Sequence, residues 1–323
     1  MLRFGYALSC EEHPPAALVR NARAAEQAGF DFAMVSDHYH PWTDRQGNSA
    51  FVWAVIGAIA QATERMALGT GVTCPTIRTH PAIVAQAAAT AAALMPGRFW
   101  LGVGTGEALN EHILGDAWPP ARVRREMLEE AVELIRKLWS GTVTYHRGPH
   151  YTVEGARLYT LPQEPPPIYV AASGPQATRL AGRIGDGLVS LAPDRGTVEL
   201  FQASGGAGKP RFGQVEVCFA EDDAEARRTA HEWWPQTALA GELAQVLPMP
   251  AHFEQAVQTV REEDVAEKVA CGPDPDRHAR ALQEFIDAGY DHVYVHQVGP
   301  EQERFLEFYA QEVLPRLRQE AHV

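Results

Sequence analysis

A short polar segment groups four side chains that can move protons or stack on a flat ring. Residues 36–42 read SDHYHPW and contain Asp37, His38, His40 and Trp42 directly after an apolar run. The pKa of histidine lies near neutrality, which suits a general base, and an indole can stack on a ring or a cation. A single histidine here would be typical of a barrel rim, whereas this group of four favours an active site.

A second segment combines alternating glycines with a carboxylate. Residues 101–111 read LGVGTGEALNE, so Gly104 and Gly106 directly precede Glu107. Glycine lets the backbone turn sharply or approach a ligand, although crowding inside a barrel would explain the same glycines. The spacing GxGxG differs from the dinucleotide fingerprint GxGxxG. Glu107 is a candidate proton donor if its surroundings raise its pKa.

Two further turns consist of small residues. Residues 169–175 end in a Ser-Gly turn that opens a helix, and its free N–H groups would suit a phosphate. The alternative is ordinary capping of that helix by Ser173. Residues 69–75, GTGVTCP, would admit a flat ring or would simply form a tight barrel end.

The elements that must position these segments alternate between short β-rich runs and amphipathic helices. Apolar residues at helical spacing and flanking prolines and glycines set the boundaries of the helices. Strands are expected at 4–8, 32–36, 67–70, 99–103, 168–172, 187–191, 215–219 and 292–296. Helices are expected at 14–28, 52–62, 83–94, 123–139, 175–182, 222–234, 274–288 and 301–317, with a loop at 203–210.

Repeated strand–helix units without a linker predict one closed (β/α)₈ TIM barrel that spans residues 1–323 as a single domain. A doubly wound open sheet is the alternative. We expect two insertions, one of short strands near 141–161 and one with scattered prolines near 235–263. Chemistry in such barrels lies at the C-terminal ends of the strands, where the candidate segments fall.

Composition limits the partners. The net charge of −13 argues against nucleic acid, which needs a basic face. The sequence has no apolar run long enough to span a membrane and no signal peptide. The cysteines are scattered without a CxxC pair, which predicts reduced thiols rather than disulfides or a zinc site. We therefore expect a cytoplasmic protein that binds a small molecule and no metal ion. The cysteines are Cys10, Cys74, Cys218 and Cys271.

Together the motifs resemble the luciferase-like monooxygenase superfamily, and within it the coenzyme F420-dependent glucose-6-phosphate dehydrogenase group. The resemblance rests on SDHYHPW at 36–42, GVGTGEALNE at 102–111, LWSG at 138–141 and AASGP at 171–175, and it runs from about residue 4 to 317. It implies a bacterial luciferase-like barrel, usually a homodimer, that binds a deazaflavin.

The resemblance also implies roles for four side chains. His38 matches the base that takes the proton from a substrate hydroxyl while hydride passes to the deazaflavin. Glu107 matches the acid that protonates the reduced ring. Trp42 matches an indole that stabilises the reacting centre, and Glu11 matches another active-site acid.

Further residues match cofactor contacts of the family. The peptide between Gly71 and Val72 matches a cis peptide behind the ring. Gly71 and Cys74 stand where the family has serine and threonine, so this chain lacks those hydroxyl groups. The matching residues are Asp37, Gly71, Val72, Cys74, Gly104, Gly106, Asn110, Ala171, Ala172, Ser173 and Gly174.

The substrate end departs from the family pattern. Lys268 matches an arginine of the family's phosphate grip, and Arg195 falls near a lysine, whereas residues 241–246 contain no cation where a third is expected. Both cations could instead be ordinary surface charges. The expected substrate is hydroxylated, such as glucose 6-phosphate, with a remodelled phosphate site. An FMN-dependent enzyme and a non-catalytic flavin-binding paralogue remain alternatives.

Overall fold

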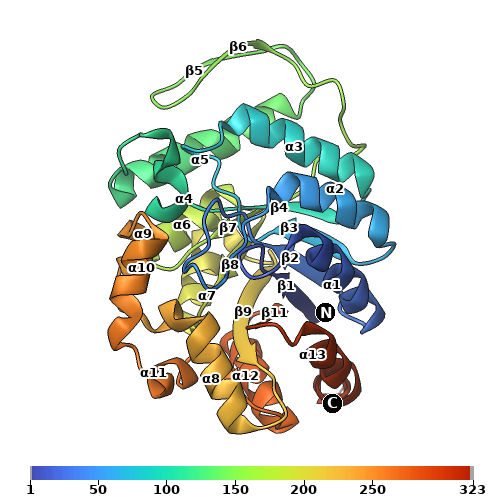
Figure 1. The fold of residues 1–323 in the computed structure, drawn as a ribbon. Coiled ribbons are helices and arrows are strands. Elements are labelled where there is room, and N and C mark those ends of the chain that lie inside the picture. Colours follow the sequence, from blue (N-terminus) through green and yellow to red (C-terminus); the bar gives the residue numbers. More distant parts are fainter. Residues whose placement is uncertain (1, 321–323) are drawn as a thin grey trace.

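Parallel strands close into an eight-stranded barrel in the computed structural model, which describes residues 2–320 (Figure 1). The first strand pairs with both the second and the last, and the sixth pairs with the seventh, so the sheet has no gap. The predicted (β/α)₈ barrel is therefore confirmed, and an open sheet is excluded. The strands are β1 (Arg3–Leu8), β2 (Phe32–Val35), β3 (Ala67–Thr70), β4 (Phe99–Val103), β7 (Ile168–Ala171), β8 (Gly187–Ser190), β9 (Arg211–Cys218) and β11 (His292–Gln297).

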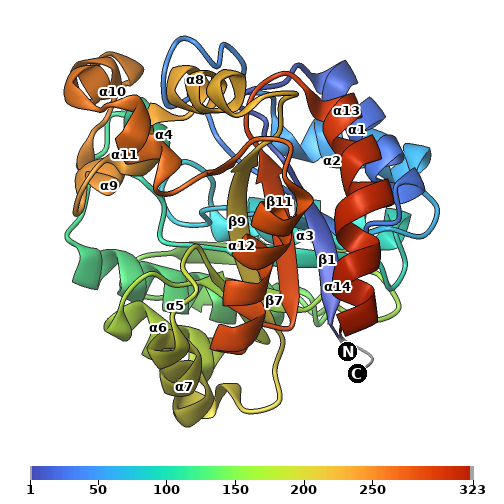
Figure 2. The same ribbon diagram turned by 90° about the horizontal axis from the view of Figure 1, so that it is seen from below.

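Helices surround the barrel, and several begin at a proline, whose fixed φ suits the first helical position. Figure 2 shows the C-terminal helices packed beside β1, next to the first helix. Among residues 2–320, no helix is long and apolar enough to cross a membrane. The outer helices are α1 (Pro15–Gln27), α2 (Val52–Ala62), α3 (Pro81–Leu94), α5 (Ala121–Leu138), α6 (Pro175–Ile184), α7 (Arg195–Phe201), α8 (Asp223–Trp233), α12 (Pro275–Ala288), α13 (Gln302–Phe308) and α14 (Leu314–Glu320).

Aromatic rings fill the N-terminal half of the barrel interior. Phe32 and Phe212 meet edge to face with ring centroids 5.4 Å apart, and Trp100 lies 5.4 Å from Phe212. Each of these residues is the first or second of its strand, and all are buried. Because the rings pack this end solidly, space for a ligand is left only towards the C-terminal ends of the strands.

Both predicted insertions are present. The first forms an antiparallel hairpin of β5 (Thr144–Arg147) and β6 (Thr152–Ala156), which arches over α3 and α5 at the top of Figure 1. The second contains short helices on one side of the barrel, the last of which packs against α8 (Figures 1 and 2). They are α9 (Leu243–Val246), α10 (Pro250–Ala256) and α11 (Glu262–Ala266).

The sequence-based boundaries were wrong in the region of β9. This strand begins at Arg211 rather than at residue 215, because Asp291 binds the Arg211 side chain and backbone N–H while Phe212 fills the barrel. A short strand, β10 (Ala270–Cys271), pairs with the end of β9 and is too brief to leave a periodic pattern. After α7 the chain leaves the helical conformation at Ser204 and Gly205, whose φ is +100°, so the loop expected at 203–210 begins close to its predicted start.

Gly102→Ala is expected to destabilise the barrel, because an added Cβ would lie 2.0 Å from the backbone oxygen of Thr70 in the neighbouring strand. Overpacking costs about 1–3 kcal/mol of unfolding free energy. Gly57→Ala in α2 is the matched control, since nothing lies within 4 Å of its added Cβ. Chemical denaturation of both variants measures the effect, and wild-type stability of Gly102→Ala would contradict this account of the packing.

Candidate active site

A cavity of about 1050 Å³ opens at the C-terminal ends of the barrel strands. Most of the residues selected from the sequence line it, although they come from strands far apart along the chain. Gly174 and Arg195 are not among its lining residues. Those that line it are Glu11, Asp37, His38, Trp42, Gly71, Val72, Cys74, Gly104, Gly106, Glu107, Asn110, Ala171, Ala172, Ser173 and Lys268.

His38 lies between two carboxylates. Its Nε2 is 3.2 Å from Glu11 Oε1 and 3.8 Å from Glu107 Oε2. On the other side of the ring, Nδ1 donates to the backbone oxygen of His40 at 3.2 Å. Because a carbonyl oxygen only accepts, Nδ1 keeps its hydrogen and Nε2 is the atom that can gain or lose a proton. That atom faces both carboxylates.

The surroundings of His38 and Glu107 shift their pKa values. Burial disfavours the imidazolium, but the charges of Glu11 and Glu107 outweigh it and raise the pKa of His38. Burial raises the pKa of Glu107 against the opposing effect of the His38 charge. The Glu107 side chain is 32% exposed to the open cavity, where it can exchange a proton with a bound molecule. Glu107 is thus the carboxyl suited to hold a proton.

Glu11 is held in place by hydroxyl groups from two strand ends. Ser9 Oγ donates to Glu11 Oε2 at 3.2 Å, and Ser36 Oγ donates to the same oxygen. Ser36 also accepts a 2.8 Å bond from the backbone N–H of Cys10. These bonds fix the loop after β1 against the end of β2, so that Glu11 meets His38. The sequence did not single out either serine, because single hydroxyl groups in a loop carry no distinctive pattern.

Asn110 connects the two polar segments of the sequence. Its Nδ2 donates to Glu107 Oε2 at 3.1 Å, and its Oδ1 accepts from the backbone N–H groups of Tyr39 at 2.8 Å and His40 at 3.2 Å. Asn110 belongs to a single helical turn, α4 (Ala108–Glu111), directly after Glu107. This amide therefore sets the position of the Glu107 carboxyl relative to the His38 loop.

A buried charge network supports the same loops from behind. Arg78 lies 2.9 Å from Asp37 Oδ1, and its backbone N–H donates to Glu111 at 2.7 Å. Thr73 Oγ1 donates to the second Asp37 oxygen at 2.8 Å. Both carboxylate oxygens of Asp37 therefore already bind protein groups, although Asp37 lines the cavity. Arg78 and Glu111 were missed because an isolated arginine and a helical glutamate give no local signal.

One wall of the cavity is formed by small residues that leave room for a flat ring. The peptide between Gly71 and Val72 is cis, as the resemblance predicted. A Cβ on Gly104 would lie 2.8 Å from Val72 Cγ2. Gly106 has a φ of +75°, which favours glycine, and a Cβ there would lie 2.5 Å from Cys74 Sγ. The wall can therefore carry no larger side chains at these glycines.

The Ser-Gly turn after β7 also borders the cavity. Ser173 lines it, whereas Gly174 occupies the N-cap position of α6. The alternative that Ser173 caps this helix is therefore wrong. Ala177 in the first turn of α6 lines the cavity as well, so the start of the helix faces the space where a negatively charged group would be favoured.

The cations at the cavity only partly match those expected. Lys268 lines the cavity, but Arg195 is exposed and donates to the backbone oxygen of Asp287 at 2.5 Å. Three arginines that the sequence analysis did not select also line the cavity: Arg227, Arg277 and Arg280. They lie on α8 and α12, which are distant in sequence but converge beside β10, and only the folded barrel brings them together.

The segment 241–246 reaches the cavity without a cation of its own. Ala244 and Gln245 line the cavity, and Gln245 Oε1 accepts a 3.1 Å bond from Arg124. Arg124 is itself buried and stacks over Trp118 at 4.3 Å. A positive charge therefore lies behind this segment, supplied by α5 rather than by the insertion.

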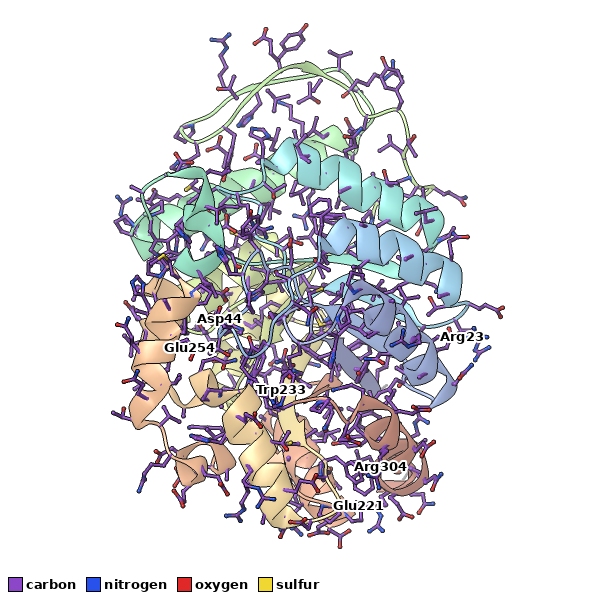
Figure 3. All side chains as sticks on the ribbon, in the orientation of Figure 1. Arg23, Asp44, Glu221, Trp233, Glu254 and Arg304 are labelled. Atoms are coloured by element: carbon purple, nitrogen blue, oxygen red, sulfur yellow. The ribbon has the colours of Figure 1, made fainter. Side chains whose placement is uncertain are left out.

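The loop that carries Trp42 is fastened to the helices of the second insertion and to α8. The Asp44 backbone N–H donates to Glu254 at 3.0 Å, and Arg45 lies 4.6 Å above the Trp233 ring. Figure 3 labels Asp44, Glu254 and Trp233 where this loop meets α8 and α10. The ring centroids of Trp42 and His38 lie 5.1 Å apart, and the Trp42 ring contacts that of Phe253 edge to face. The insertion thus holds the indole beside the histidine.

The fold and the site place this chain among (β/α)₈ barrels that bind a ligand at the carboxyl ends of their strands. A model of the luciferase-like monooxygenase family matches residues 2–292. The chain therefore belongs to that family, as its motifs predicted.

Several similar proteins have named activities. The chain is 38% identical over 330 residues to an F420-dependent glucose-6-phosphate dehydrogenase of Nakamurella multipartita, covering 98% of this chain and 97% of that protein. It is 40% identical over 322 residues to an F420-dependent hydroxymycolic acid dehydrogenase of Mycobacterium tuberculosis, covering 97% and 88%. A solved F420-dependent secondary alcohol dehydrogenase, in complex with an F420-acetone adduct, matches with a TM-score of 0.91 and 29% identity over 98% of this chain and 99% of that one.

Glu11→Gln is expected to lower the pKa of His38, because it removes the nearer of the two negative charges that stabilise the imidazolium. The stabilisation from a raised histidine pKa is present below the unfolded value of about 6.5 and is lost as the pH rises through the folded value. The variant should therefore lose more unfolding free energy at acidic pH than at alkaline pH.

An NMR titration of the His38 ring measures this pKa directly. Glu64→Gln, at an exposed position after α2, is the matched control and should leave the titration unchanged. An unaltered or raised His38 pKa in Glu11→Gln would show that the ion pair does not set the protonation of the histidine.

Proposed function

We propose that this protein is a coenzyme F420-dependent dehydrogenase that transfers a hydride from the carbinol carbon of a hydroxylated substrate to the deazaflavin. The observation that carries the proposal is the position of His38 Nε2 between Glu11 and Glu107, beside a cavity wall of glycines. The named activities of the similar proteins support the same cofactor and reaction class.

The residues of the cavity fit a planar tricyclic ring. Gly71, Val72 and Gly104 form a surface from which no side chain larger than valine projects, and an added Cβ on Gly104 would occupy that space. Ser173 and the first turn of α6 would hold the polar extension of the cofactor. When bound, the oxidised deazaflavin supplies a ring carbon that accepts a hydride. The residues of this chain would bind the ring and control protons around it.

His38 would take the proton of the substrate hydroxyl at Nε2. Its Nδ1–H is fixed on the His40 carbonyl, so the ring presents one defined basic nitrogen. The imidazolium formed in this step is stabilised by Glu11 at 3.2 Å, which favours proton transfer as the carbonyl product develops. The ring centroid of Trp42 lies 5.1 Å from that of His38, so the indole packs against the proposed base.

Glu107 would hold the proton that neutralises the reduced cofactor. Burial raises its pKa, and Asn110 orients its carboxyl at 3.1 Å. Two groups with separate environments on one cavity wall can serve as base and acid in the same turnover. The alternative cofactor, FMN, would use the same wall, but the similar proteins reported above are named for F420.

We propose a sugar phosphate such as glucose 6-phosphate as the substrate. Lys268 and Arg227 line the side of the cavity near β10, where they can receive an anionic group. Arg277 also lines it but is paired with Asp223 at 2.8 Å, and Arg280 lies 3.8 Å from Asp274. A second candidate is an unphosphorylated secondary alcohol. It is favoured by the position of Arg195, which binds the Asp287 carbonyl outside the cavity, and by the absence of a cation in residues 241–246.

Mixing the protein with oxidised F420 and glucose 6-phosphate is expected to bleach the visible absorbance of the cofactor. His38→Ala should slow this reduction by about 10²–10⁴-fold, the usual contribution of a positioned base, and Glu107→Gln should also slow it. Cofactor binding, followed by fluorescence, should persist in both variants.

A panel that includes glucose, propan-2-ol and longer secondary alcohols separates the two substrate candidates. Reduction with glucose 6-phosphate but not with glucose supports the phosphate, whereas reduction with secondary alcohols alone supports the second candidate. No bleaching with any member of the panel, or full activity of His38→Ala, would contradict the proposed function.

A further inference from the structure

A buried amide faces the cavity with neither of its polar atoms bonded. Gln236 is 6% exposed and lines the cavity. Within residues 2–320, neither its Oε1 nor its Nε2 has a hydrogen-bond partner. Buried polar side chains in folded proteins are nearly always hydrogen-bonded, so an unpaired amide that faces a cavity indicates a ligand partner.

The turn that carries Gln236 is fixed on both sides. The residues form a short 3₁₀ turn, Pro235–Ala238, directly after α8. Trp234 Nε1 donates to one oxygen of Glu216 at 2.8 Å, and Thr237 Oγ1 donates to the other at 2.5 Å. Glu216 belongs to β9, so the barrel itself anchors the turn. The amide is therefore held at the cavity rather than free to reach solvent.

This turn is also connected to the loop of the proposed base. Gln46 accepts from the Trp42 backbone N–H at 2.8 Å through Oε1 and donates to the Trp233 backbone oxygen at 2.9 Å through Nε2. One glutamine side chain thus links the segment that bears His38 and Trp42 to the end of α8. A substrate that meets His38 would have the Gln236 turn as a neighbouring wall.

A second unpaired group lies on the same wall. His296 lines the cavity, is buried, and has no partner for Nδ1 among the described residues. Its Nε2 bonds to Glu12 at 2.5 Å, and its ring packs on Trp234 with centroids 4.4 Å apart. The wall therefore offers an amide donor, an amide acceptor and an imidazole nitrogen in one region.

The chemistry of this wall suits a neutral hydroxyl group. Glu216 lines this wall and would repel a phosphate, whose binding is better served by the cations near β10. Glu12 lies behind the wall and its charge is paired with His296. A hydroxyl group both donates and accepts a hydrogen bond, as does the amide of Gln236. We propose that Gln236, assisted by His296, binds a substrate hydroxyl other than the one that is oxidised, and so selects polyhydroxylated substrates over simple alcohols. This inference rests on the proposed function.

The test compares Gln236→Leu with the wild type on glucose 6-phosphate and on its 2-, 3- and 4-deoxy analogues. We expect kcat/KM for glucose 6-phosphate to fall roughly 10–100-fold, which corresponds to one lost hydrogen bond of a buried group. For one deoxy analogue the two proteins should react equally, because the partner hydroxyl is absent. The fluorescence titration of F420 should not change.

Thermal unfolding separates binding from a structural role. Leucine removes an unpaired buried amide at similar volume, so the melting temperature of Gln236→Leu should be unchanged or raised. A lowered melting temperature with an equal loss on every analogue would overturn the inference. Gln86→Leu, at an exposed position on α3, is the matched control.

Two further outcomes distinguish a failure of this inference from a failure of the proposed function. If the wild type reduces F420 with simple secondary alcohols and with no polyol, the proposed function stands and this inference fails. If no alcohol reduces F420, the proposed function fails. Calorimetric titration of glucose 6-phosphate into the protein without cofactor still tests Gln236 then, and equal affinity of wild type and Gln236→Leu would overturn the inference.

Discussion

The ion pair between His38 and Glu11 imposes the constraint on which the rest of the site depends. The two side chains come from loops after neighbouring strands, β1 and β2, and both are almost excluded from solvent. A buried charge is tolerated only when it is paired and hydrogen-bonded, and removing one partner of such a pair typically costs about 3–5 kcal/mol. The serines around Glu11 and the carbonyl behind His38 meet that requirement, and they also fix which nitrogen exchanges a proton.

The small-residue wall of the cavity is subject to a different requirement, the absence of large side chains. A flat ligand needs a wall without large side chains, and the barrel supplies one directly after β3 and β4, at Gly71, Val72 and Gly104. The aromatic rings at the N-terminal half of the barrel keep the strands apart, so the wall does not collapse inward. The polar loops and the small-residue wall thus border one cavity, as the proposed hydride and proton transfers require.

The barrel and the two proposed proton-transfer residues could be predicted from the sequence. Periodicity and turn residues located the strands, and the position of His38 and Glu107 just after strands placed them in one site. The supporting residues could not be predicted in this way. Ser36, Arg78 and Gln236 act through contacts with segments distant in the chain, and each is an ordinary polar residue locally. Arg195 was predicted at the substrate end, but its side chain donates to the backbone oxygen of Asp287 on α12 and does not line the cavity. The sequence around Arg195 gives no sign of this contact.

The most direct measurement is the pH dependence of single-turnover F420 reduction in the wild type and in Glu11→Gln. If neutral His38 is the base and protonated Glu107 the acid, the rate should rise as the pH passes the raised pKa of His38 and fall again when Glu107 loses its proton. Removing Glu11 should shift that rise to lower pH, since the imidazolium loses its nearer partner. A profile that does not move, or one that is flat in both proteins, would contradict a proton-accepting role for His38.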